Sequence, residues 1–166
     1  MDASPLLLEF VNTVDVEIAT DAFGTPGELT AWLLERDLID SAARADTVLL
    51  TQTVQLRTAL RAAMAAHHGD RPDPDAGLLC RALSPFPLRV CCADGPGLSP
   101  ANDGAAGGVA RVAVAGTWAR LKICSEETCQ WAFHDASKNR SRTWCSMRVC
   151  GNRTKTRAYR ARQRAE

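Results

Sequence analysis

Four cysteines toward the C-terminal end of the chain stand in two pairs whose spacing suits a metal site. Four residues separate the members of each pair and fifteen lie between the pairs, which are Cys124 with Cys129 and Cys145 with Cys150. Two such pairs can bring four thiolates around one Zn²⁺ at about 2.3 Å. Reduced core cysteines, a redox dithiol and an iron–sulfur cluster are the alternatives. We favour zinc, and because thiolates fill all four positions, the ion would be structural and not catalytic.

The residues around these cysteines offer little apolar surface. Residues 121 to 166 could not fold on a hydrophobic core alone, and a structural zinc ion can supply most of the folding free energy of so small a unit. His134 lies between the pairs, and with four cysteines present we expect it at the surface or beside the site. We expect Trp131 and Trp144 to pack over the metal site.

The segment after the second cysteine pair is basic and contains no proline. From about Ser146 onward its only glycine is Gly151, so we predict a C-terminal helix that begins beside the pair. At about 100° per residue, its cations fall on two rows with small residues between them. One row holds Arg153, Arg157, Arg160 and Arg164, and the other holds Arg148, Lys155 and Arg162.

Two cationic rows suit the phosphate ridges that border a groove of duplex DNA, and small residues between them allow close approach to the bases. A solvated surface helix normally interleaves Glu, whereas this chain has none between Glu127 and Glu166. Asn152 could read a base edge, but we favour a role in shaping the turn after the metal ligand. With two arginines from the loop between the cysteine pairs, the predicted DNA contacts are Arg140, Arg142, Arg153, Lys155, Arg157, Arg160, Arg162 and Arg164.

The residues around the second pair resemble a known family. Cys150-Gly151-Asn152-Arg153, with Trp144-Cys145-Ser146-Met147 and Asn139-Arg140-Ser141-Arg142 before it and a basic tail after it, resembles the CGNR zinc finger, which is named for that tetrad. The resemblance covers about residues 120 to 164. It implies a DNA-binding regulator that holds zinc on the four matched cysteines.

The N-terminal part resembles a second family. Leu8-Glu9-Phe10-Val11-Asn12-Thr13 and a helix around Trp32-Leu33 are similar to the ABATE domain, which accompanies this finger in bacterial stress-induced transcription regulators. We therefore expect an acidic, mostly helical ABATE-like domain over residues 1–117 and a CGNR-type finger over residues 118–166. Asn12 is either a satisfied core amide or a polar anchor in a ligand pocket, and Trp32 is either a core residue or part of such a pocket.

The charges separate the same two parts. Residues 1–117 carry eight Arg and no Lys against fifteen Asp and Glu, a net charge of −7, whereas residues 118–166 carry twelve basic and four acidic residues, a net charge of +8. An acidic body with a basic tail is typical of a regulatory domain joined to a polyanion-binding segment. No apolar run approaches the about 20 residues that cross a bilayer, and Met1–Leu8 has no basic leader. We expect a cytoplasmic protein without a membrane partner.

Helices are the main elements that must position these residues. Thr25-Pro26-Gly27-Glu28 predicts an N-cap and the first turn of a helix, and Ser41–Arg44 opens a longer helix that ends at His67–Asp70. Further predicted elements are a helix over Ala76–Leu83, a strand over Leu88–Cys92 and a domain boundary at Gly104–Gly108. For Leu6–Thr13 and Val109–Ala115 the pattern allows a helix or a strand, and we favour a helix for both. The fold class is α+β, mainly α, with a small β-hairpin or strand element in the helical domain and a zinc module that ends in a basic helix.

The remaining cysteines, Cys80, Cys91 and Cys92, show no ligand spacing, and for Cys91 and Cys92 we expect buried small hydrophobes. An enzyme with one of these two as nucleophile would need a base, for which His67 and His68 are candidates, but no motif supports it. We predict a zinc-dependent DNA-binding transcription regulator whose acidic domain senses an unknown small-molecule effector or forms a homodimer. The alternative is a zinc knuckle that binds protein or RNA without sequence-specific DNA binding.

Overall fold

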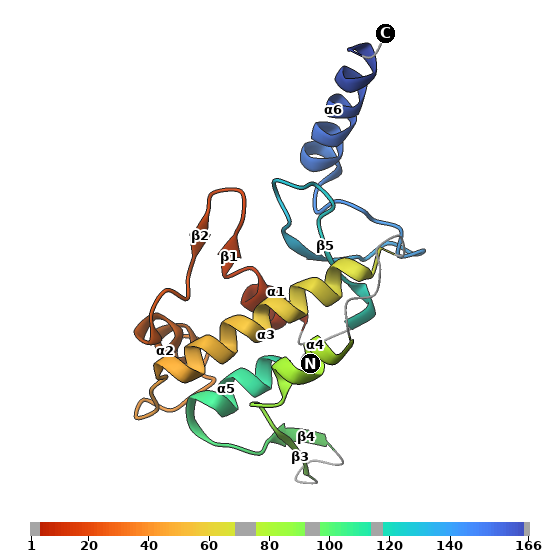
Figure 1. Ribbon diagram of the computed structural model, residues 1–166. Helices are drawn as coiled ribbons and strands as arrows, with labels where there is room; N and C mark the ends of the chain where they lie inside the picture. The colour runs from red at the N-terminus through yellow and green to blue at the C-terminus, as the bar shows by residue number, and fades with distance from the viewer. Residues whose placement is uncertain (1–3, 69–75, 92–96, 114–117, 165–166) are drawn as a thin grey trace.

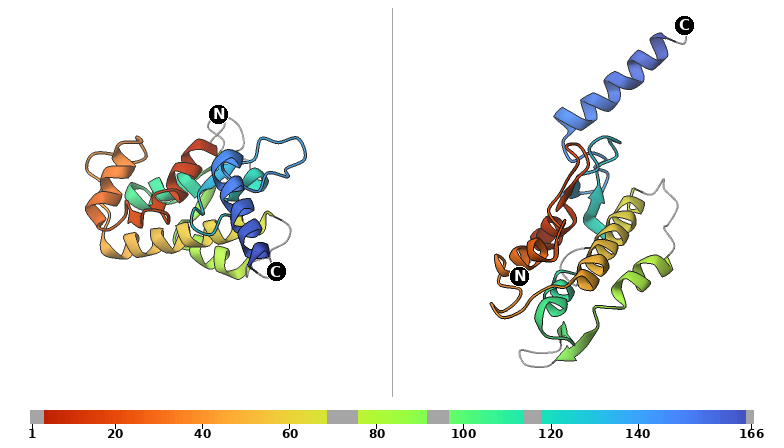
Figure 2. Two further views of the ribbon diagram at one scale, coloured as in Figure 1. Left: turned by 90° about the horizontal axis from the view of Figure 1, so that it is seen from above. Right: turned by 60° about the vertical axis from the view of Figure 1, so that its left-hand side comes forward.

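The computed structural model describes residues 4–68, 76–91, 97–113 and 118–164. A long helix, α3 (Thr47–Ala66), runs through the centre of the N-terminal body (Figure 1). Four helices pack against it: α1 (Ser4–Val11), α2 (Pro26–Leu34), α4 (Ala76–Leu83) and α5 (Gly104–Ala113). The C-terminal helix, α6 (Asn152–Gln163), projects from one end of the molecule (Figure 2).

Strands are short and form three antiparallel pairs in the described part of the chain. These are β1 (Val14–Asp15) with β2 (Thr20–Asp21), β3 (Leu88–Cys91) with β4 (Gly97–Pro100), and β5 (Leu121–Ile123) with β6 (Ala132–His134). The β3–β4 hairpin lies at the end of the molecule away from α6, and β1–β2 reaches toward the finger (Figure 1). The α+β, mainly α class is confirmed. The strand from Leu88 is present, and with β4 it forms the small hairpin that the predicted fold class allowed.

One apolar core joins the helical body to the β5–β6 strand pair of the zinc module. Phe10 and Met64 are fully buried, and Leu121, Ile123 and Ala132 from β5 and β6 belong to the same cluster. The finger therefore rests on the body through its β-hairpin. Its cysteines form a separate small cluster.

Local capping explains where the helices begin. Thr25 accepts a hydrogen bond from the Glu28 N–H at 3.3 Å, as the N-cap prediction requires, and α1 confirms the predicted helix near the N-terminus. The predicted start of the long helix at Ser41–Arg44 is wrong. The carboxylate of Asp46 accepts from the Leu49 N–H at 2.7 Å, and α3 begins after it, because an Asp N-cap also complements the helix dipole.

The predicted boundary at Gly104–Gly108 is also wrong. This segment is the first part of α5, and its glycines permit close packing. A Cβ on Gly108 would lie 2.7 Å from Ile39 Cγ2 and 3.1 Å from the Leu38 carbonyl oxygen. The glycines thus place α5 against the loop after α2 instead of marking a linker.

The structure tests some of the remaining predictions, and others concern residues that it does not describe. The helix over Ala76–Leu83 is confirmed. Cys80 is exposed, while Cys92 and the side chain of Cys91 lie outside the described part of the structure. Among the described helices, none is long and apolar enough to cross a membrane.

Candidate metal centre and basic helix

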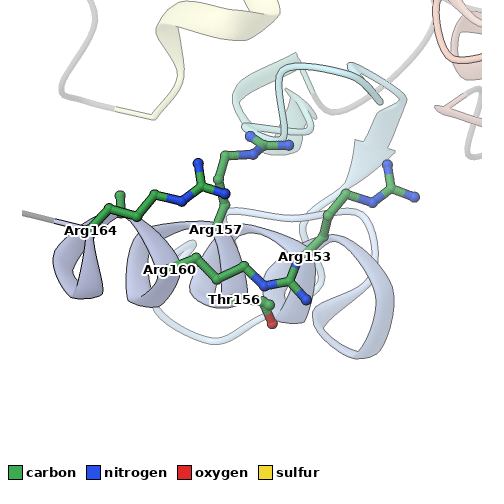
Figure 3. Close-up of a pocket in the computed structure, with 6 residues that line it drawn as sticks. Arg153, Thr156, Arg157, Arg160 and Arg164 are labelled. Atoms are coloured by element: carbon green, nitrogen blue, oxygen red, sulfur yellow. The ribbon is translucent and has the colours of Figure 1, made fainter.

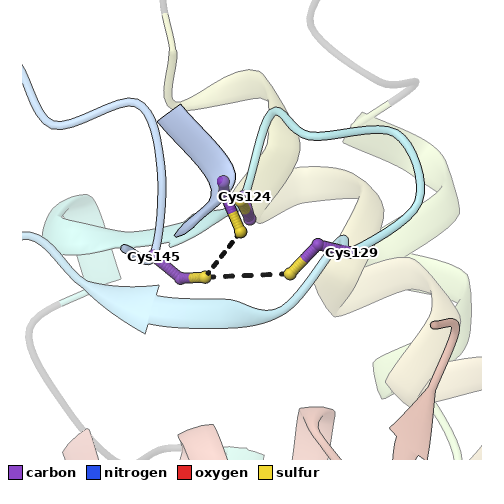
Figure 4. Close-up of side chains that lie close together, drawn as sticks. Cys124, Cys129 and Cys145 are labelled. Carbon is purple, nitrogen blue, oxygen red and sulfur yellow. Dashed lines mark hydrogen bonds between the residues drawn. The ribbon is translucent and has the colours of Figure 1, made fainter. Parts of the chain in front are cut away.

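The four predicted ligands come from two turns that face each other. Cys124 follows β5 and Cys129 precedes β6, while Cys145 lies just before η2, a π-helical turn over Met147–Gly151, and Cys150 lies within it. All four Sγ atoms lie within 4.8 Å of one another. Figure 4 shows the labelled sulfurs turned toward a common centre. The structure therefore brings the four predicted cysteines together.

The distances between sulfurs fit a tetrahedral zinc site. Zn–S bonds of about 2.3 Å place neighbouring sulfurs about 3.8 Å apart in a tetrahedron. The Sγ of Cys145 lies 3.7 Å from that of Cys129 and 3.6 Å from that of Cys150. Burial raises the pKa of the Cys145 thiol and raises the pKa of Cys150 to about 11. A divalent cation supplies the charge that holds such thiols together as thiolates, and four of them leave no position for water.

A buried ion pair that sequence reasoning missed shapes the loop between the cysteine pairs. Lys122 Nζ lies 2.9 Å from Asp135 Oδ2, and the two side chains are 4% and 0% exposed. Burial opposes the charge on Asp135, but hydrogen bonds from Ser137, Lys122 and the backbone hold its pKa well below its usual range. The local signal was the Asp-Ala-Ser sequence, because an Asp that caps the residue two positions on is a turn signature.

A second buried carboxylate, Glu126, anchors α6 to the first cysteine turn. Its side chain is 0% exposed and accepts from Thr128, Thr154 and Arg157 at 3.1, 2.7 and 2.7 Å. The hydrogen bond from Thr154 is the largest influence, and with those from Arg157 and Thr128 it lowers the pKa of Glu126 to about 2 against the effect of burial. Arg157, a predicted DNA contact, is therefore an internal partner of the finger. No sequence pattern indicated this contact between distant residues.

Glycine and asparagine of the Cys-Gly-Asn-Arg tetrad shape the turn after the last ligand. A Cβ on Gly151 would lie 2.5 Å from Met147 Sδ and 3.3 Å from the Trp144 ring, so glycine permits this close approach. The Asn152 side chain donates to the Arg148 carbonyl at 3.0 Å, as the turn-shaping interpretation requires. Trp144 packs against the cysteine cluster as predicted. Trp131 is 39% exposed and does not belong to this cluster, so its packing over the metal site stays a prediction.

Two of the predicted phosphate contacts, Arg153 and Arg142, already have partners within the chain. Arg153 donates to Glu17 in the β1–β2 turn at 2.9 Å and to the Thr128 hydroxyl at 3.0 Å. The Arg142 guanidinium donates to the Trp144 carbonyl at 3.0 Å and lies 5.0 Å from the Phe133 ring centroid. Structural contacts thus occupy Arg142 and Arg153, and their contact with phosphate stays a prediction.

The arginines of the first predicted row share one side of α6. They line a hollow of about 480 Å³ along the helix (Figure 3), and its lining residues are Arg153, Thr156, Arg157, Arg160, Ala161 and Arg164. Lys155 and Arg162, from the second row, are exposed, as is Arg140 in the loop. Nothing within α6 is buried.

Two family models match the chain. The CGNR zinc finger model matches residues 120–163, and the ABATE model, described as "Putative stress-induced transcription regulator", matches residues 4–121. The chain belongs to the ABATE family. No curated protein matches it. Together with the converging sulfurs, the finger match means that this ABATE family member holds one structural zinc ion on the four cysteines.

Hydrogen bonds from side chains to backbone tie the ABATE segment (residues 4–121) to the finger. The Asn12 amide donates to the Ala132 carbonyl at 2.9 Å and accepts from the Ala132 N–H at 2.8 Å. Arg61 of α3 bridges the Val11 and Gln130 carbonyls at 2.7 and 2.8 Å. Asn12 therefore acts as a satisfied amide that joins α1 to β6.

Two histidines at the end of α3 add to this connection. His67 Nδ1 and His68 Nε2 each lie 2.6 Å from a carbonyl oxygen of β5, that of Leu121 for His67 and that of Ile123 for His68. Because a carbonyl only accepts, each ring nitrogen carries the proton that it donates. These contacts give both histidines a structural role in fixing β5.

Trp32, the other predicted pocket residue, belongs to the core of the ABATE segment. It is 8% exposed and makes edge contacts with Phe10 and Phe23, with ring centroids 5.8 and 5.7 Å apart. The Arg36 guanidinium covers its outer face at 4.2 Å from the ring centroid. Packing and hydrogen bonding within the chain account for Asn12 and Trp32, and the ligand pocket stays a prediction.

Proposed function

We propose that this protein is a zinc-dependent, DNA-binding transcription regulator in which the finger holds α6 out for duplex DNA. One observation carries the proposal: α6 projects from the finger with no buried residue and lies in a stretch that has no acidic residue between Asp135 and Glu166. A cationic helix that contacts no core has a surface suited to a polyanion.

The first turns of α6 are held to the finger, although the surface of the helix is exposed. Glu126 accepts from both Thr154 and Arg157 in the first turns of the helix, and the zinc ligand Cys150 stands two residues before the helix begins. Zinc and this buried carboxylate therefore orient α6 relative to the finger before any DNA is bound. Such preorganisation reduces the free energy lost on ordering a binding surface.

In this proposal the ABATE segment provides the regulatory input in the cytoplasm. It contacts the finger through Asn12 and Arg61, which both bind backbone of the first cysteine turn or its strand. A change in the body, caused by an effector or by a second copy of the chain, would reach the zinc module through these bonds.

The test is fluorescence anisotropy of a labelled duplex of about 20 base pairs, titrated with the zinc-loaded chain across a salt series. The expected result is binding that weakens steeply with salt, since each neutralised phosphate releases counterions. A single-stranded RNA and a duplex RNA of the same sequence are the comparison ligands. Absence of duplex-DNA binding at low salt, or tighter binding to RNA, would contradict the proposal and favour the zinc-knuckle alternative.

A further inference from the structure

The two sides of α6 differ in the charges that face them. Arg153 and Arg157, on one side, contact the carboxylates of Glu17 and Glu126 at 2.9 and 2.7 Å. Glu127 lies 4.0 Å from Arg157 on the same side. This inner side of the helix, which carries Arg153 and Arg157, is turned to the finger and is already close to negative charge.

The opposite side of α6 carries Lys155, Tyr159 and Arg162. Each stands two residues after an arginine of the inner row, which places it about 160° around the helix from that arginine. The three share one stripe, since they are spaced four and three residues apart. All three are exposed, Tyr159 by 58%, and within the described residues no acidic group forms an ion pair with Lys155 or Arg162.

We propose that this outer face of α6, formed by Lys155, Tyr159 and Arg162, is the surface that enters the groove of duplex DNA. The inference rests on the proposed function. It assigns entry into the groove to the outer face and not to the arginine row, whose first two members are bound to glutamates. Phosphates approaching the inner side would meet Glu17, Glu126 and Glu127, whereas phosphates approaching the outer side would meet Lys155 and Arg162 and no acidic residue of the helix.

The chemistry of the outer face suits the major groove of B-form DNA. That groove admits an α-helix, and Arg and Lys can donate to the acceptors of guanine there. An exposed Tyr gives an apolar ring that can contact a thymine methyl group and a hydroxyl that can donate to phosphate. Because helix α6 has no acidic residue, the whole face is compatible with this partner.

Arg160 and Arg162 provide a matched pair for the test. Both are exposed arginines of the same helix, so Arg160→Ala and Arg162→Ala remove the same charge from opposite sides. In the duplex anisotropy assay, Arg162→Ala is expected to weaken binding about tenfold and to lower the salt slope by about 1, whereas Arg160→Ala changes affinity by less than about twofold. Tyr159→Ala should weaken binding, and Tyr159→Phe should restore the part that depends on the ring.

Zinc content and far-ultraviolet circular dichroism of each variant confirm that the helix and finger remain folded. Equal losses for Arg160→Ala and Arg162→Ala would mean a nonspecific charge effect and would overturn the face assignment while leaving DNA binding intact. A larger loss for Arg160→Ala would place the duplex in the hollow of the inner row and would overturn it too. If the wild-type chain fails to bind duplex DNA, both this inference and the proposed function fall.

Discussion

The helical body and the finger are stabilised in different ways. The body buries large apolar side chains, including Phe10, Leu29 and Met64, in one continuous cluster. The finger buries charged groups, including Lys122 and Asp135, beside four cysteines. A unit as small as the finger cannot exclude enough apolar surface from water, so a metal and fully paired charges replace the core. The two regions should therefore respond to different perturbations.

The largest expected effect comes from removing zinc. Chelation, or Cys124→Ser, is expected to unfold the finger while the body keeps its fold, because structural zinc contributes about 10–16 kcal/mol in small zinc units. Amide NMR spectra would show collapse of finger signals alone, and elemental analysis would show the loss of zinc. Cys80→Ser is the control, since Cys80 is exposed and outside the cluster. Unchanged zinc content in Cys124→Ser would contradict the ligand assignment.

Breaking the buried pair of the finger comes next. Asp135→Asn leaves Lys122 buried without its counter-charge and is expected to cost about 3–5 kcal/mol in the free energy of unfolding, measured by denaturant titration. Asp40→Asn, at an exposed aspartate, is the control.

The stability difference between wild type and Asp135→Asn should also depend on pH. Because the folded state lowers the pKa of Asp135, the pair stabilises the protein fully above the ordinary value of 3.8 and progressively less as pH falls below it. The advantage of wild type over Asp135→Asn should therefore shrink in acid. An advantage that grows in acid would show that the pair is not ionised.

A cavity in the body should destabilise the body and leave the zinc site of the finger intact. Met64 is fully buried in α3, so Met64→Ala is expected to lower the free energy of unfolding by about 2–5 kcal/mol. Thermal unfolding of the body would report the loss, while zinc stoichiometry stays at one per chain because the ligands are local to the finger. Loss of zinc in Met64→Ala would mean that the two regions fold as one unit.

The smallest expected effect lies where the two regions meet. Asn12→Ala removes both hydrogen bonds to the Ala132 backbone and is expected to cost about 1–3 kcal/mol, since a partly buried N–H and carbonyl lose their partner. Hydrogen exchange should accelerate in β6 and little elsewhere. The exposed Asn102→Ala serves as control. Slower or unchanged exchange of β6 would argue that the core contacts of Leu121 and Ile123 alone hold the finger.

Sequence reasoning succeeded where chemistry is local. The spacing of the four cysteines predicted the metal centre, and the Thr25 cap predicted the start of α2. It failed where the outcome depends on distant residues. The glycines within residues 104–108 resemble a linker in sequence, and only the approach of Ile39 in the folded chain shows why residue 108 is glycine.

The same limit applies to the charged residues of the finger. Arg157 and Arg160 are indistinguishable by helical periodicity, because both fall on one row. The buried carboxylate of Glu126 separates them in the structure, because it forms an ion pair with Arg157 and not with Arg160. Charge pattern therefore predicted a polyanion partner but not which side of α6 would meet it.

DNA binding at known zinc content tests directly whether zinc orders the finger and the finger presents α6 to DNA. Anisotropy of a single labelled duplex would be followed through three states of one sample: zinc-loaded, chelated, and reloaded with zinc. We predict that salt-sensitive binding is lost on chelation and recovered on reloading. Binding of equal affinity and equal salt slope in all three states would contradict the claim, because the basic tail would then act without the finger.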